Sequence, residues 1–155
     1  MMTEGSLTKP LDVVLLVRSI LRRLDAGHMK AFEQRLKTQK LQYFAQLFDV
    51  SPSYNFTLYL RGPYSTHLAS DLFRLEEAGV EYNSEKFTSN ELEERFTTLR
   101  EFVKEKTVRE LEIIATLHWL INIADLSRAA ANKRLVELKS PSTEELEKAN
   151  KALAW

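Results

Sequence analysis

The 155-residue chain contains no cysteine. Disulfides, thiolate metal ligands and cysteine nucleophiles are therefore excluded, and the absence is consistent with a reducing compartment. A disulfide scaffold is not needed at this length, because one core can bury roughly two-thirds of the unfolded surface. We therefore predict a single domain over residues 1–155, with residues 1–9 frayed.

The chain also lacks an excess of charge and a long apolar run. Its 22 basic and 22 acidic residues cancel, so no overall field attracts nucleic acid or an anionic membrane. The most apolar run, Leu11 to Leu21, contains Arg18 and is well short of the ~20 residues that span a bilayer. Only Lys9 offers the positive charge of a signal peptide before this run. We expect a cytoplasmic protein without a membrane partner.

Residue patterns that carry catalysis are missing as well. The four glycines are scattered and form no phosphate-binding loop, and Ser65 lacks the flanking glycines of a nucleophile elbow. Among the three histidines, only His67 has a second ligand type at helical spacing, Asp71, and such a lone pair is more often a hydrogen bond than a metal site. We predict no enzyme activity, no catalytic residues, no cofactor and no metal.

The most strongly patterned segment is extended. Phe56, Leu58 and Leu60 alternate with polar residues, which predicts a half-buried strand with these three side chains on its inner face. Gly62-Pro63 should end the strand, because proline lacks the N–H that a ladder needs. A lone strand would leave its backbone unpaired, so residues 80–86 are a candidate partner strand.

Helices are predicted over most of the remaining chain, because apolar residues recur there every three or four positions. Ser65 and Thr107 are placed to cap helix starts, and Gly79 is placed to end a helix in the left-handed conformation. Phe73 is expected on the buried side of its helix, and residues 108–124 are apolar enough for a central buried helix. The predicted helical ranges are 10–25, 36–49, 66–79, 91–103, 108–124, 126–138 and 140–153. The expected fold class is mainly α (α+β), with six or seven helices around a short strand or β-hairpin.

Charge is distributed unevenly along the chain. Residues 18–40 hold seven basic and two acidic residues, whereas residues 71–105 hold ten acidic and five basic ones. The two segments could form one basic and one acidic face, but ion pairing between them is the favoured interpretation, because surface ion pairs are common. An open basic face would bind phosphates, with Tyr59 or Tyr64 stacking on a base. The predicted order of a helix, a strand, a turn and a second helix is also compatible with part of a winged helix. A DNA-binding transcriptional regulator is therefore the alternative function.

Several segments together resemble a known family. They are Gln34–Phe44, Phe56–Leu60, Gly62–Ser65, Leu68–Leu72, Thr116–Leu120 and Leu138–Leu146. In order and spacing, from about Arg35 onward, they resemble the Panacea-type antitoxin domain and related bacterial and archaeal proteins. One departure is Ser140, which stands between Lys139 and Pro141, where the family pattern has proline directly after lysine.

This resemblance implies a compact helical fold around a short β element, with no catalytic centre and a role in binding protein partners. Members of toxin–antitoxin pairs neutralise a toxin encoded beside them, so the expected partner is such a toxin, with a homodimer as a further alternative. The candidate residues for binding a partner or nucleic acid are Arg35, Lys37, Lys40, Arg61 and Tyr64. The structural alternative is that Tyr64 packs at the helix start and that Lys37 and Lys40 cover apolar surface with their stems.

Overall fold

The computed structural model describes residues 7–80 and 89–154, and it confirms a mainly helical single domain with a short β-hairpin. Most of the predicted strand partner, residues 81–86, lies outside the described residues. None of the helices described is both long and apolar enough to cross a membrane. The helices are α1 (Leu11–Arg23), α2 (Phe32–Leu47), α3 (Thr66–Glu77), α4 (Asn90–Val103), α5 (Val108–Asn122), α6 (Arg128–Lys139) and α7 (Thr143–Ala152), and the strands are β1 (Thr57–Tyr59) and β2 (Gly62–Tyr64).

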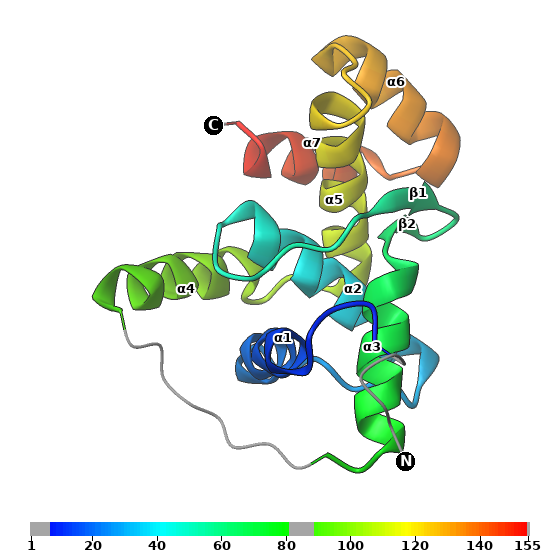
Figure 1. The fold of residues 1–155 in the computed structure, drawn as a ribbon. Coiled ribbons are helices and arrows are strands. Elements are labelled where there is room, and N and C mark those ends of the chain that lie inside the picture. Colours follow the sequence, from blue (N-terminus) through cyan, green and yellow to red (C-terminus); the bar gives the residue numbers. More distant parts are fainter. Residues whose placement is uncertain (1–6, 81–88, 155) are drawn as a thin grey trace.

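Helix α5 is the central element, as predicted. In Figure 1 it runs through the middle of the molecule, and α2, α6, α7 and β2 all pack against it. Every residue from Leu111 to His118 is buried, because neighbours surround this part of the helix. The start is fixed by a reciprocal cap: the Thr107 hydroxyl accepts from the Glu110 N–H at 3.0 Å, and the Glu110 carboxylate accepts from the Thr107 N–H at 3.0 Å.

One contiguous core joins all the helices described. Leu21 of α1, Phe44 of α2 and Leu72 of α3 are buried in it, as are Phe96 of α4 and Leu117 of α5. The C-terminal helices reach the same core with Ala131 and Leu135 on α6 and Ala149 on α7. Both helices pack against α5.

The β element is a hairpin rather than a strand that ends at Gly62-Pro63, so this part of the prediction is wrong. The chain reverses at Leu60 and Arg61, and residues Gly62–Tyr64 return as β2, antiparallel to β1. Leu58 lies opposite Pro63. Phe56 and Leu58 pack against the core as predicted, but Leu60 is 90% exposed. Leu60 leaves the inner face because it lies in the turn, where the alternation of a strand no longer applies.

Helix α3 follows the predicted pattern with one exception. The Ser65 hydroxyl accepts a hydrogen bond from the Leu68 N–H at 3.2 Å, and Gly79 adopts the left-handed conformation with φ of +65°. Leu68, Leu72 and Leu75 are buried on one stripe. Phe73 is 53% exposed, contrary to the prediction, because it lies about 100° around the helix from Leu72.

The start of α2 and the end of α6 differ from what the sequence pattern predicts. Helix α2 begins at Phe32, four residues before the predicted start, and the Gln34 side chain accepts from the Ala31 N–H at 3.0 Å. Alanine at the N-cap has no capping oxygen, so the usual start signal is missing there. Ser140, the departure from the family pattern, closes α6 with φ of +46°.

Candidate interaction site

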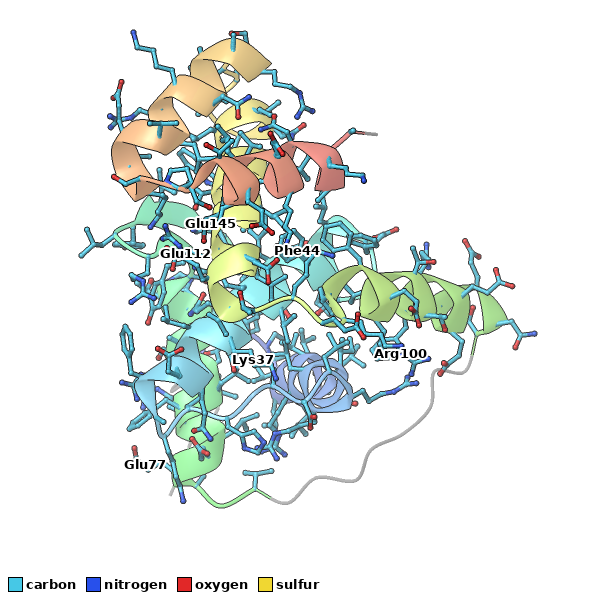
Figure 2. The ribbon with its side chains drawn as sticks, turned by 180° about the vertical axis from the view of Figure 1, so that it is seen from behind. Lys37, Phe44, Glu77, Arg100, Glu112 and Glu145 are labelled. Carbon is cyan, nitrogen blue, oxygen red and sulfur yellow. The ribbon has the colours of Figure 1, made fainter. Side chains whose placement is uncertain are left out.

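A cluster of charged side chains around the buried Glu112 and Lys139 holds the hairpin against α5. Glu112, on α5, has a side chain that is only 1% exposed, and Figure 2 shows it close to Glu145 of α7. Its carboxylate pairs with Nε of Arg61 in the hairpin turn at 3.0 Å and with Nζ of Lys139 on α6 at 2.9 Å. Arg109 lies 3.7 Å from the same carboxylate and pairs with Glu145 at 3.3 Å. The cluster therefore links the hairpin to α5, α6 and α7.

Lys40 of α2 contacts the hairpin beside this cluster. Its ammonium group is fully buried and donates to the carbonyl oxygen of Pro63 at 2.8 Å. Burial lowers the pKa of Lys40 to about 8, the charge of Glu112 opposes that change, and the charges of Lys139 and Arg61 reinforce it. Burial raises the pKa of Glu112, but hydrogen bonds and charges from Lys139 and Arg61 outweigh burial and hold it below its usual range.

Gly62 is the residue that lets the hairpin approach this cluster. Its φ is +92°, a conformation that L-residues rarely adopt. A Cβ at this position would lie 3.0 Å from the Thr116 hydroxyl, 3.1 Å from the Lys40 ammonium and 3.2 Å from Cγ of Glu112. Glycine is therefore required here both for the backbone conformation and for the close contact.

The outer surface of the hairpin is apolar and aromatic. Nζ of Lys139 donates to the carbonyl oxygen of Leu60, which fixes the turn with the leucine side chain pointing into solvent. The rings of Tyr59 and Tyr64 meet edge to face at 5.4 Å. The guanidinium groups of Arg61 and Arg35 lie 5.7 and 5.9 Å from the ring centroid of Phe32, which is half exposed. We call these residues of the hairpin and its surroundings the hairpin face; they are Phe32, Arg35, Tyr59, Leu60, Arg61 and Tyr64.

The structure brings together three of the five residues that the sequence singled out. Arg35, Arg61 and Tyr64 belong to the hairpin face. Lys40 lies beneath it and is fully buried, so it positions the hairpin and contributes no surface charge. Lys37 points elsewhere, into a groove beside α4.

The basic segment 18–40 does not form one basic face. Arg18 is buried and donates to the Val80 carbonyl oxygen at 3.0 Å. Arg23 pairs with Glu93 of the acidic segment at 3.1 Å, as the ion-pairing interpretation predicted. Arg35 donates to the carbonyl oxygens of Met29 and Lys30. Buried and paired charges thus account for much of the asymmetry along the chain.

Sequence reasoning missed Glu112, Lys139, Phe32 and Leu60. Glu112 carried a usable signal, because a carboxylate within the apolar run of a central helix needs a buried partner. Leu60 carried a weaker one, since an apolar residue directly before Arg61-Gly62 could also have been read as part of a turn. Lys139 and Phe32 become recognisable only when α6 and the start of α2 are placed beside the hairpin.

Two other polar clusters are internal to the fold. The Tyr43 hydroxyl lies 2.6 Å from Nδ1 of His118, both residues are buried, and burial lowers the pKa of His118. Asp71 is fully buried and accepts from Thr8 and from the Tyr54 hydroxyl, whereas His67 is exposed. Over residues 7–80 and 89–154, no group of three or more histidine or acidic residues could hold a metal ion.

Comparison with protein-family models, curated proteins and solved structures finds no match for this chain. The resemblance to the Panacea-type antitoxin domain therefore stays a prediction, as does the likeness to a winged helix. The functional argument has to come from the chemistry of the site.

Proposed function

We propose that this chain is a non-catalytic interaction protein of the cytoplasm that binds a protein partner through the hairpin face. The observation that carries the proposal is Leu60, a 90% exposed leucine at the tip of a hairpin whose position is held by buried charges. Burying an ion cluster seldom stabilises a fold more than an apolar core would. Such a cluster is explained if it serves to present the turn in one orientation.

The composition of the hairpin face favours a protein partner over DNA. Protein interfaces are enriched in aromatic residues and arginine, and their energetic centres are anchors that fill a pocket on the partner. Leu60, Tyr59 and Phe32 would supply apolar anchors, with Arg61 and Arg35 beside them. Phosphate binding instead needs uncommitted cations, whereas Arg61 pairs with Glu112 and Arg35 caps backbone carbonyls.

The resemblance to antitoxins narrows the expected partner to a toxin encoded beside this chain. The test is co-expression of the tagged chain with each protein encoded next to it, followed by co-purification. We expect one neighbour to inhibit growth when expressed alone, to be neutralised by this chain and to co-purify with it. Leu60→Glu should abolish both co-purification and neutralisation, because it places a charge at the proposed anchor.

The matched control is Ile123→Glu, which adds the same charge at another exposed apolar residue, at the end of α5. This variant should retain the complex, and both variants should unfold at the same temperature as the parent. Equal co-purification by the Leu60→Glu variant would contradict the proposed surface. Absence of any toxic or co-purifying neighbour would contradict the antitoxin-like role.

The two alternatives have separate signatures. A DNA-binding regulator should give an electrophoretic shift that weakens steeply between low and physiological salt, because counterion release drives such binding. A homodimer formed through the hairpin face should show twice the monomer mass in solution, and Leu60→Glu should reduce it to the monomer.

A further inference from the structure

The hairpin turn carries an arginine that uses only part of its hydrogen-bonding capacity. Arg61 donates from Nε to Glu112 at 3.0 Å, and its side chain is 46% exposed. Within residues 7–80 and 89–154 its two terminal Nη groups have no hydrogen-bond partner, although a guanidinium group can donate five hydrogen bonds. Figure 1 shows the turn at the periphery of the molecule, beside the end of α6. The outer edge of this guanidinium group is therefore available to an acceptor on another molecule.

The charges gathered around this arginine do not balance, although the whole chain has no net charge. Four cations meet two carboxylates there, namely Lys40, Arg61, Arg109 and Lys139 against Glu112 and Glu145. Two positive charges are thus left without a counterion among the described residues. Lys40 and Lys139 are buried, so a molecule that approaches the hairpin meets this excess through Arg61. The excess favours an anionic group on that molecule.

The outward surroundings of Arg61 are apolar. Its guanidinium group lies 5.7 Å from the ring centroid of Phe32, which is half exposed, and the neighbouring Leu60 is exposed as well. Water weakens an ion pair less once apolar groups and a partner cover it. A carboxylate can accept from both Nη groups at once, and such paired hydrogen bonds are among the strongest in proteins.

We infer that the partner bound by the hairpin face carries an aspartate or glutamate on the rim of an apolar pocket. This inference rests on the proposed function and names the chemistry of the partner. Leu60 fills the pocket, and the carboxylate accepts from the Nη groups of Arg61, which is the next residue in the same turn. A phosphate backbone fits less well, because it needs several accessible cations, and Lys40 and Lys139 are buried beneath the turn.

Phage display of a folded single-domain scaffold with randomised loops tests this inference without a known partner. Clones are selected on the immobilised full chain, and those that also bind the Leu60→Glu variant are removed. We expect the loops of the remaining clones to be enriched in aspartate and glutamate beside apolar residues, relative to the unselected library. Arg61→Gln should weaken the binding of these clones at least about tenfold, the effect of losing one charge-assisted hydrogen bond.

The matched control is Arg134→Gln. Arg134 lies on α6 outside the hairpin face, its side chain is 53% exposed, and it pairs with one carboxylate, that of Glu137. It therefore resembles Arg61 in exposure and pairing, and its replacement should leave the affinity of the clones unchanged. Thermal unfolding establishes that folded proteins are compared, and in Arg61→Gln the buried Glu112 still has Lys139 as a partner.

A double-mutant cycle separates a direct contact of Arg61 from a structural role. Replacing the selected aspartate or glutamate of a clone by its amide should weaken binding to the parent chain about as much as Arg61→Gln does. In the Arg61→Gln background the same replacement should cost little more, because the two groups act as one pair. If Arg61 only held the turn against Glu112, the two losses would multiply and the inference would fall.

The remaining outcomes also decide the matter. Clones that need Leu60 but show no acidic enrichment, or that bind the Arg61→Gln variant as tightly as the parent, would overturn the inference and leave the proposed function intact. Binding of a single-stranded oligonucleotide that Arg61→Gln abolishes would show phosphate recognition instead. A selection in which no clone distinguishes the parent from Leu60→Glu would count against the hairpin face itself, and with it against both proposals.

Discussion

Lys40 makes the stability of this protein depend on pH in an unusual direction. Burial lowers the pKa of Lys40 from 10.5 to about 8, so the folded state releases this proton at a lower pH than the unfolded chain does. Between these two values the unfolded state binds more protons, and the free energy of unfolding must therefore rise with pH. From about pH 7 to about pH 9.5 the expected gain is about 2 kcal/mol.

Lys40→Met tests this reasoning, because methionine keeps much of the length and packing of the side chain without its charge. In urea unfolding of the parent protein, Lys40 should contribute a rise of about 2 kcal/mol in the free energy of unfolding over this pH range. The Lys40→Met variant should lack that rise. The upper limit is set near pH 9.5 because tyrosines of the unfolded chain begin to ionise at about pH 10.

Lys37→Met is the matched control, since it removes the charge of a partly exposed lysine from the same helix. This control should retain the parental rise. The reasoning is refuted if Lys40→Met rises as steeply as the parent, because the ammonium of Lys40 would then not titrate between the two states.

Three further predictions concern stability. Gly62→Ala should lower the free energy of unfolding by about 2–3 kcal/mol, and Gly79→Ala should lower it by only about 1 kcal/mol. Both glycines have positive φ, but of the two only Gly62 has atoms close to where a Cβ would lie. Urea unfolding of the two variants measures the losses, and equal losses would contradict the close contact at Gly62. Glu112→Gln should destabilise the protein by about 3–5 kcal/mol, since Lys139 would remain buried without its partner, and a loss below about 1 kcal/mol would mean that the cluster does not hold the hairpin. Burial lowers the pKa of His118, so the unfolded state binds more protons as the pH falls below about 6.5 and stability must decline; His118→Phe should flatten that decline in urea unfolding at about pH 7 and pH 5.

The helices of this protein are encoded locally. Ser65 and Thr107 cap helix starts as predicted, because a cap needs only its own side chain and an amide two or three residues ahead. The apolar stripe of α3 and the central burial of α5 were likewise readable from the spacing of apolar residues. Such features depend on neighbours within a few positions, so no knowledge of the fold is needed to find them.

The site depends on contacts between distant parts of the chain. Glu112 meets Arg61 across 51 positions of sequence, and Lys40 meets the Pro63 carbonyl across 23. Whether a lysine supplies surface charge or is buried under a turn depends on which helix packs against that turn, and Lys37 and Lys40 differ in this although they lie one helical turn apart. A three-residue offset leaves the two side chains only about 60° apart around α2, so the packing of α2 against the hairpin and α4 decides the role of each.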